Sequence, residues 1–335
     1  MRVTTVDYHT GGEPFRIVPE PPVGLPGDSV ADRRARATPG SEADDLRRLL
    51  CYEPRGHADM YGGFLVPPDD EGADLGVLFW HRDGFSTACG HGTIALGAWA
   101  VGSGRVDAPA DGVTDVVVDV PSGRVTARVR TVAGQVDTVD FVNVASYLVT
   151  DDLAVTTSRG ELRVAVAYGG ALYAHLDVAQ VGLQVVPEHR AELTALGHEV
   201  KRVLNDHDVA RHAGDHRLSG IYGTILYEDL GATADGLHQR NVTIFAEGEL
   251  DRSPCGSGTA SRLAALVAGG AMTPDQVLTH DSIVGSRFVA RVESQTQADG
   301  YAAVVPVVTG RASPTGEHTF LVDPRDDLVP GFLLR

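Results

Sequence analysis

Two stretches of the chain decide its fold: CGHGTIALGAWAVGSG at residues 89–104 and CGSGTASRLAALVAGG at residues 255–270. Aligned on the first cysteine, they agree at seven positions, at offsets 0, 1, 3, 4, 9, 12 and 15. The spacing is 255 − 89 = 166 residues, about half of a chain of 335 residues. A segment that recurs at this distance predicts two halves built on one architecture.

Each stretch predicts a helix that begins directly after its cysteine. Glycine and threonine suit a turn that enters a helix, and a glycine-rich stop follows about a dozen helix-forming residues. The first helix has almost no polar face, and the second has only Ser261 and Arg262 as polar interruptions. A helix that is apolar all round is enclosed by other elements, so we expect both helices to be buried.

Alternating or β-branched runs on both sides of these helices predict the sheets that enclose them. These runs are Val116–Val120, Arg124–Val129, Val164–Ala167, Ile221–Tyr227, Asn241–Ala246, Phe288–Val292 and Ala302–Val308. Further helices are expected at Ala43–Leu50 and His189–Asn205. The predicted fold is α+β, with two pseudo-symmetric lobes, each a curved sheet or barrel around one central buried helix. Both cysteines then begin helices, and we expect them to face each other across the lobe interface.

Composition excludes several classes of function. A formal net charge of −17 leaves no basic surface for nucleic acid or an anionic membrane. No signal peptide or long apolar run is visible, and three cysteines without close spacing are no disulfide framework, so we expect a cytoplasmic protein with reduced thiols. Lys201, the one lysine, lies in a charged stretch that predicts an exposed helix face, which argues against a pyridoxal-phosphate Schiff base. We expect no cofactor.

The paired cysteines predict acid–base chemistry at a carbon centre. Inverting a stereocentre at Cα needs a base on one face and an acid on the other. Two equivalent thiols, Cys89 and Cys255, serve both directions of such a reaction. A helix N-terminus lowers the pKa of a thiol, so one thiolate and one thiol are expected to coexist near neutral pH.

The same helix starts predict a binding site for the substrate carboxylate, because their backbone N–H groups bind oxyanions. Gly90, His91, Gly256 and Ser257 are placed to supply those donors. His91 is also close enough in sequence to tune the Cys89 thiol. Asp251, four residues before Cys255, is expected to hold the substrate nitrogen.

The same residue types have other interpretations. Cys51 has no repeat around it and is expected to be a small core residue. A glycine turn copied by gene duplication would explain the repeat, but not the duplicated cysteine. No metal is expected, because the chain has no Cys-x-x-Cys pair. His57 and Asp59 fit an exposed loop pair as well as active-site groups.

These motifs resemble the proline racemase family, which includes proline racemases, 4-hydroxyproline 2-epimerases and trans-3-hydroxy-L-proline dehydratases. The matching segments span nearly the whole chain: Asp7-Tyr-His-Thr-Gly-Gly-Glu-Pro14, Pro54-Arg-Gly-His-Ala-Asp-Met-Tyr-Gly62, Ala88-Cys-Gly-His-Gly-Thr93, Tyr168-Gly-Gly170 and Asp251-Arg-Ser-Pro-Cys-Gly-Ser-Gly-Thr259.

The resemblance implies the fold of diaminopimelate epimerase, with an active site between two lobes. It implies an N-terminal lobe of residues 1–146, joined by a returning segment of about 310–335, and a C-terminal lobe of residues 147–309. It assigns the acid–base pair to Cys89 and Cys255, carboxylate binding to Gly90, His91, Gly256 and Ser257, and contact with the ring nitrogen to Asp251.

The resemblance leaves the reaction open between two branches of the family. Dehydratases commonly carry threonine in place of the second cysteine, so Cys255 favours racemisation or epimerisation at C2 of proline or 4-hydroxyproline. Gly84–Cys89 and Gly169–Ala171 look more like the dehydratase branch, and Glu249 stands where glutamine is common. Dehydration of trans-3-hydroxy-L-proline and silent binding of an amino acid are the alternatives. The sequence does not determine the oligomeric state, and a homodimer is compatible with it.

Overall fold

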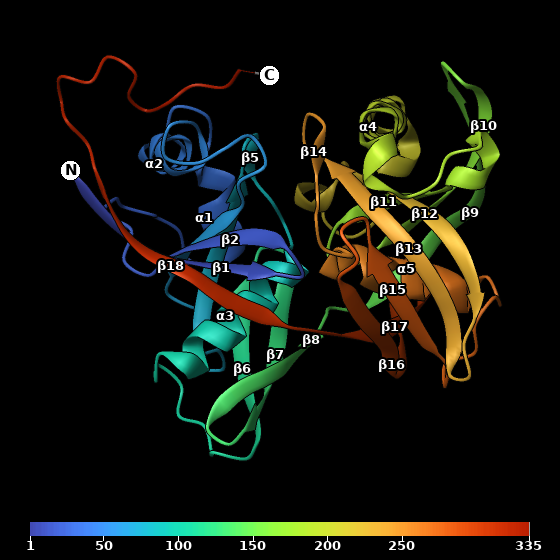
Figure 1. Ribbon diagram of the computed structural model, residues 1–335, viewed down its shortest axis with the longest axis horizontal. Coiled ribbons are helices and arrows are strands. Elements are labelled where there is room, and N and C mark those ends of the chain that lie inside the picture. The colour runs from blue at the N-terminus through green and yellow to red at the C-terminus, as the bar shows by residue number, and fades with distance from the viewer. Residues whose placement is uncertain (335) are drawn as a thin grey trace. The chain divides into compact units, whose positions relative to one another are not determined.

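The computed structural model describes residues 1–334, which form an α+β fold of two compact units (Figure 1). One unit holds Met1–Val139 and the segment that begins at Arg311, and the other holds Asp140–Gly310. No helix within residues 1–334 has the length and apolar character needed to cross a bilayer.

The unit Asp140–Gly310 is a closed barrel. Its strands, in the order in which neighbours pair, are β9 (Ser146–Thr157), β10 (Gly160–Tyr168), β11 (Leu172–Asp177), β12 (Ile221–Ala232), β13 (Gly236–Phe245), β15 (Val277–Ser282), β16 (Arg287–Ala298) and β17 (Tyr301–Gly310). β17 also pairs with β9, which closes the ring. The short β14 (Glu249–Leu250) pairs with β13, and α4 (Arg190–Asn205) packs on β12 and β13.

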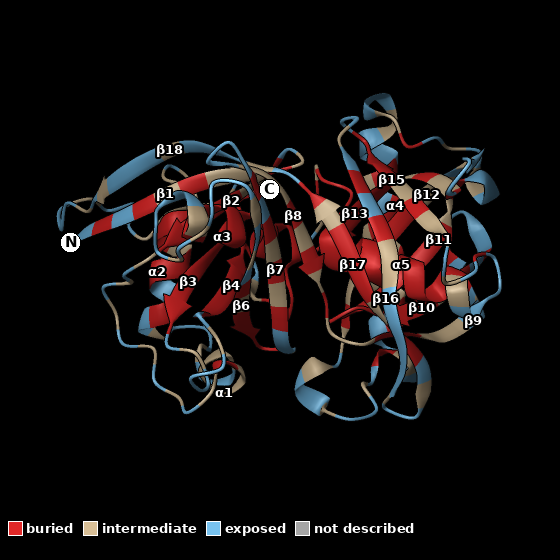
Figure 2. Cartoon of the chain, turned by 90° about the horizontal axis from the view of Figure 1, so that it is seen from below, coloured by how far each residue is buried: buried red, intermediate tan, exposed pale blue. Residues whose placement is uncertain are grey.

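The helix α5 (Gly256–Ala268) packs against β9, β10, β11, β16 and β17 of this barrel. It is buried along its length as far as Leu266, as its colour in Figure 2 shows. The strands therefore surround α5, a helix with almost no polar face, as the sequence predicts. Four short 3₁₀ turns complete the unit: Val178–Val181, Pro187–His189, Asp208–Ala210 and His216–Leu218.

The other unit has a sheet in the order β18 (Ala312–Leu321), β1 (Arg2–Thr10), β2 (Glu13–Val18), β3 (Gly62–Val66), β4 (Leu75–His81), β6 (Gly112–Val120) and β7 (Gly123–Val132). β5 (Gly84–Phe85) pairs with β4, and β8 (Gln135–Val142) follows β7. The helices are α1 (Val30–Arg36), α2 (Glu42–Cys51) and the buried α3 (Gly90–Gly102), which packs against β1, β2, β6, β7 and β18.

The two units repeat one pattern of strand pairing. The strands β18, β1, β2, β3 and β4 pair in the same directions as β9 to β13, with the parallel pair β2–β3 equivalent to β11–β12. In both units a short strand (β5 or β14) and a buried helix (α3 or α5) follow. The next strand (β6 or β15) then pairs in parallel with β4 or β13. The segment after Arg311 thus supplies the strand that completes the first pattern.

The spacing of 166 residues extends beyond the cysteines. α3 and α5 begin and end 166 residues apart (256 − 90 and 268 − 102). The β7–β8 turn at Ala133-Gly134 and the β16–β17 turn at Asp299-Gly300 keep the same spacing, and all four residues have positive φ. Two residues with positive φ make the tight hairpin turn whose twist suits the flanking strands.

Most elements expected from the sequence are present, with shifted ends. All seven predicted strands lie in observed ones, except that β13 stops at Phe245 because Ala246 turns to a φ of +46°. The expected exposure of Lys201 is only partly right: the residue is half-buried on α4, and its Nζ donates to the carbonyl oxygen of Ala246 (2.9 Å).

The contact between α4 and the barrel gives a test of this packing. A Cβ at Gly197 would lie 2.6 Å from Cβ of the buried Ile244 on β13. We expect Gly197→Ala to lower the free energy of unfolding by about 1–3 kcal/mol, because overpacking outweighs the gain in helix propensity. Chemical denaturation measures this, with the exposed Ala195→Gly on the same helix as control. A stabilisation of about 1 kcal/mol, as helix propensity alone predicts, would contradict the packing.

Candidate functional site

Cys89 lies in the loop between β5 and α3 and caps the helix with its own side chain. Its Sγ accepts a hydrogen bond from the backbone N–H of Gly92 (3.3 Å). A Cβ at Gly92 would lie 2.8 Å from that sulfur and 2.4 Å from the ring of Phe15. Glycine at offset 3 of the repeat therefore lets the thiol approach the first helical turn.

His91 lies beside this thiol, with its Nδ1 3.5 Å from Sγ of Cys89. The rings of Phe15 and Tyr61 pack edge-on against the imidazole, at 5.8 and 4.9 Å between centroids. Burial lowers the pKa of His91 to about 3, so the ring is neutral at physiological pH. The ring also hydrogen-bonds to the backbone of Pro14, which only partly opposes this lowering, and it contributes no positive charge to the binding of a carboxylate.

Cys255 lies between β14 and α5 and has a different backbone. Its φ is +63°, whereas Cys89 has a φ of −155°. Its side chain makes no hydrogen bond that caps α5. Gly258, again at offset 3, still allows close approach, because a Cβ there would lie 2.8 Å from Sγ.

The Cys255 thiol interacts with polar groups of the same unit: the carboxylate of Asp251 and the hydroxyl of Thr243 on β13. The hydroxyl of Tyr173 on β11 also interacts with this thiol and lies 2.7 Å from Oγ of Ser257. The sequence did not indicate Tyr173 or Thr243. Both are strand residues that reach Cys255 only once the barrel has closed. The one sequence feature that could have pointed to them is a polar side chain within an otherwise apolar, buried strand.

The expectation that the helix start lowers the thiol pKa is wrong for Cys255. Burial raises the pKa of this thiol well above its usual value, and the negative charge of Asp251 raises it further. The Gly258 N–H and the Thr243 hydroxyl act in the opposite direction but do not compensate. Cys255 is therefore a thiol at neutral pH, suited to donating a proton.

Asp251 is buried beside Cys255. One of its oxygens accepts hydrogen bonds from the backbone N–H (2.8 Å) and the hydroxyl (2.7 Å) of Ser253. Burial raises the pKa of Asp251 to about 6. The carboxyl group is thus largely ionised at pH 7 and can bind a cationic nitrogen.

The remaining predicted site residues lie in the first turns of the two helices. Gly90 begins α3, and Gly256 and Ser257 begin α5; all three are buried. N–H groups in the first turn of a helix have no partner within the helix. Each unit therefore brings one thiol together with the N–H donors that an oxyanion needs: Cys89, Gly90 and His91 in one, and Asp251, Cys255, Gly256 and Ser257 in the other.

Residues outside these helix starts have other roles. Cys51 is fully buried in an apolar cluster with its Sγ 3.3 Å from the Met60 carbonyl oxygen, as expected for a core residue. His57 is exposed and Asp59 is buried, so they do not form a plain exposed pair. Within residues 1–334 the three cysteines form no disulfide.

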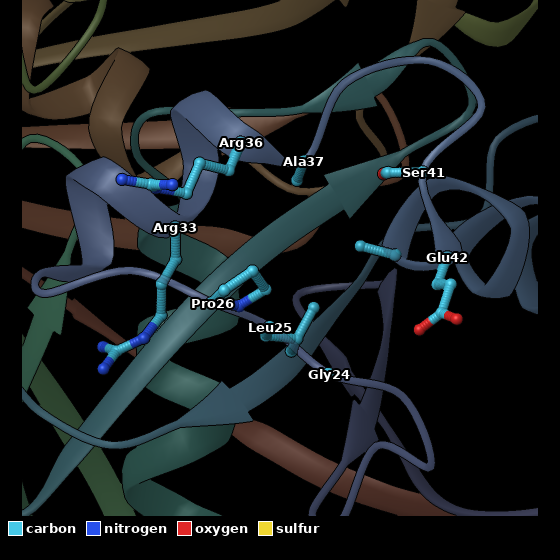
Figure 3. A pocket seen from close by; sticks show the side chains of 9 residues that line it. Gly24, Leu25, Pro26, Arg33, Arg36, Ala37, Ser41 and Glu42 are labelled. Atoms are coloured by element: carbon cyan, nitrogen blue, oxygen red, sulfur yellow. The ribbon is translucent and has the colours of Figure 1, made fainter.

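The grooves around α1 and α2 are remote in sequence from both cysteines. One has a volume of about 520 Å³ and lies between Arg33 and Arg36 of α1 on one side and Ser41 and Glu42 at the start of α2 on the other (Figure 3). A second, of about 410 Å³, is lined by Leu46 and Leu49 of α2. None of the predicted site residues lines either groove.

Comparison with known proteins gives the family. A family model of proline racemases matches residues 5–333. The chain belongs to the proline racemase family.

Relatives within the proline racemase family carry more than one activity in their names. The chain is 42% identical over 335 residues to a 3-hydroxyproline 2-epimerase of Burkholderia multivorans, covering 99% of this chain and 98% of the relative. It is 39% identical over 331 residues to a trans-3-hydroxy-L-proline dehydratase of Bacillus thuringiensis, with the same two coverages. A crystal structure of a hydroxyproline epimerase from Agrobacterium vitis with bound trans-4-hydroxy-L-proline aligns with a TM-score of 0.93 at 30% identity, covering 99% and 95% of the two chains.

The charge of Asp251 gives a test of the Cys255 environment. Because this charge raises the thiol pKa, Asp251→Asn is expected to lower it and to speed the reaction of Cys255 with iodoacetamide at pH 7.5 about tenfold, one pKa unit being a factor of ten in thiolate. Peptide mass spectrometry measures the rate, with the exposed Asp235→Asn as control. An unchanged or slower reaction would show that Asp251 does not act on the thiol.

Proposed function

We propose that this chain inverts C2 of a proline-type imino acid without a cofactor, with Cys89 and Cys255 as its acid and base. One observation carries the proposal: the two units have equivalent buried helices, and each begins with a buried thiol beside a glycine at offset 3. Equivalent groups are what a reversible inversion needs, since each acts as base in one direction and as acid in the other.

In the proposed reaction, the thiolate of one cysteine takes the proton from Cα. The electron pair left at Cα delocalises into the substrate carboxylate, which the first-turn N–H groups of Gly90, His91, Gly256 and Ser257 stabilise. The thiol of the other cysteine returns a proton from the opposite face, and its sulfur becomes the thiolate. Atoms and charge balance, and the enzyme is ready for the reverse reaction.

Asp251 has two effects in this scheme. Its carboxylate pairs with the positively charged ring nitrogen of the substrate. The same charge raises the pKa of the Cys255 thiol, and a cationic nitrogen placed beside Asp251 offsets that charge. Binding of the substrate thereby makes Cys255 a stronger acid than in the free protein, at the moment when a proton is to be delivered.

The comparisons support a hydroxyproline as substrate. The relatives and the solved structure are named for 3-hydroxyproline and 4-hydroxyproline reactions. We therefore place 3- and 4-hydroxyproline beside proline among the substrates of the proposed epimerisation. Its partner is a small molecule, and a homodimer is the assembly we propose. With three cysteines outside any disulfide, we place the reaction in the cytoplasm.

Dehydration of trans-3-hydroxy-L-proline is the second candidate. It is favoured by relatives of that name at 39–41% identity and by the residues around Cys89 and Gly170. In that reaction Cys89 removes the α-proton, and the 3-hydroxyl group leaves as water when the second thiol protonates it. A catalytically silent binding protein is the third candidate.

Proton NMR in D₂O distinguishes the three candidates. Proline, trans-4-hydroxyproline and trans-3-hydroxyproline are incubated in parallel with the protein. The proposed function predicts deuterium at Cα for at least one of them. A hydroxyproline substrate also gives signals of its C2 epimer, whereas the two forms of proline are enantiomers with identical spectra. Loss of the signal of the hydrogen on the hydroxylated C3 of trans-3-hydroxyproline, with formation of an imine, would establish the dehydratase instead. Unchanged spectra for all three would support silent binding.

Replacement of each thiol tests the two-base mechanism. We expect Cys89→Ser and Cys255→Ser each to lower kcat for inversion by about 10³-fold, because a serine hydroxyl is a far weaker acid than a thiol at neutral pH. Cys51→Ser, in the core of the same protein, is the control for loss of a thiol as such. Inversion at more than a tenth of the wild-type rate by Cys255→Ser would contradict the mechanism.

A further inference from the structure

The backbone of Cys255 is in a region that side-chain-bearing residues rarely adopt, with a φ of +63° and a ψ of 110°. Such a conformation is strained and persists only where the surroundings hold it. We propose that His280, acting through Asn241 and Thr259, is a positioning residue that holds the peptide before Cys255 and so sets the direction of its thiol. This inference rests on the proposed role of Cys255 as acid and base.

Hydrogen bonds hold the peptides on both sides of Cys255. The carbonyl oxygen of Pro254 accepts two hydrogen bonds, from the side-chain amide of Asn241 (3.0 Å) and from the hydroxyl of Thr259 (2.9 Å). The N–H of Cys255 donates to Oγ of Ser253 (3.0 Å), and its carbonyl oxygen accepts from the N–H of Thr259 (2.8 Å). Neither φ nor ψ of Cys255 can change without breaking some of these bonds.

His280 holds the two donors in place. On β15, its Nε2 lies 2.9 Å from the amide nitrogen of Asn241, and its Nδ1 lies 2.8 Å from the hydroxyl of Thr259. All three side chains are buried, with 0% exposure. The group His280–Asn241–Thr259, which we call the Pro254 clamp, links a strand of the barrel wall to the central helix.

Counting protons assigns the state of His280. The hydroxyl of Thr259 has one proton, which goes to Pro254, so its oxygen accepts from the Nδ1–H of His280. The amide of Asn241 has two N–H groups, one for Pro254 and one for Nε2, which must then be unprotonated. This is the neutral imidazole with its proton on Nδ1. Burial lowers the pKa of His280 to about 3, which agrees with that state.

The equivalent threonine of α3 bonds differently. Thr93 donates to the carbonyl oxygen of Cys89 itself (2.9 Å), one residue later in the repeat than the carbonyl that Thr259 contacts. Cys89 has an ordinary extended backbone and caps its own helix with Sγ, whereas Cys255 does not cap α5. The Pro254 clamp therefore accompanies the difference in backbone conformation between the two cysteines.

The clamp has a functional consequence for the thiol. With φ positive, Sγ of Cys255 interacts with Asp251, Thr243 and Tyr173 in addition to the N–H of Gly258 in the first turn of α5. If the clamp is broken, Cys255 is free to relax to the backbone seen at Cys89. Its sulfur would then move away from the charge of Asp251, which makes the thiol more acidic, but it would no longer be directed at the substrate.

The test uses the full-length protein and two matched buried histidines. His280→Leu removes the clamp. His175→Leu is the control, because His175 is equally buried in the same barrel and bonds α5 at Ser261 (3.2 Å) without touching Pro254. Three quantities are measured: kcat and KM for the turned-over imino acid, the iodoacetamide rates of Cys255 and Cys89 in the same molecule, and Tm.

For His280→Leu we expect kcat to fall about tenfold or more with KM changed less than about threefold, the loss expected from a hydrogen bond worth about 1–1.5 kcal/mol. We also expect the ratio of Cys255 to Cys89 alkylation to rise about fivefold or more, since the thiol leaves the Asp251 charge. His175→Leu should leave the ratio unchanged even if Tm falls. Equal effects of the two variants on the alkylation ratio would overturn the proposal, because the loss of any buried histidine from the barrel would then explain both.

Thr259→Val and Thr259→Ser keep the proposal testable if His280→Leu does not fold. Valine has the shape of threonine without its hydroxyl, and serine keeps the hydroxyl. The clamp predicts that Thr259→Val raises the alkylation ratio and Thr259→Ser restores it; equal ratios would overturn it. Because alkylation needs no substrate, this outcome stands apart from the proposed function, which fails if the wild-type protein inverts none of the three imino acids.

Discussion

The close approach of a buried thiol to the first turn of a buried helix is the contact on which both halves of this protein depend. It needs a glycine at offset 3, because a Cβ at Gly92 or Gly258 would lie 2.8 Å from the sulfur. It also needs an apolar helix enclosed by strands, since only that keeps the thiol and the unpaired N–H groups out of water. Each unit meets both needs with the same pattern of strand pairing.

The repeat made most of the fold predictable, because glycine, threonine and cysteine at fixed offsets are local signals for a helix start. The pairing of strands that lie far apart in the sequence was harder to predict. β18 completes the sheet of Met1–Val139 from more than 170 residues after that part of the chain ends, and only the family resemblance pointed to it. The positive φ of Cys255 could not be read from the sequence either, since the residues that we propose to hold it, Asn241 and His280, lie on separate strands.

The candidate site was predictable in its residues but not in its electrostatics. The position of Cys255 at a helix start predicted a lowered thiol pKa, because the N-terminus of a helix favours negative charge. In the structure, burial and the Asp251 carboxylate outweigh the helix start and raise that pKa. The two thiols, equivalent in sequence, therefore differ in backbone and in surroundings. The two thiols therefore approach the two faces of the substrate in the proposed reaction with different surroundings. The difference comes from residues found in one unit only, such as Tyr173 and Thr243.

The most direct test of the account is whether one substrate molecule contacts both thiols. The protein is titrated with the imino acid that it turns over, and iodoacetamide labelling of Cys89 and Cys255 is followed by peptide mass spectrometry, with the core residue Cys51 as internal reference. The account predicts that both cysteines are protected, with the same midpoint concentration. Protection of one cysteine while the other reacts as in the free protein would contradict a two-thiol reaction at a single carbon.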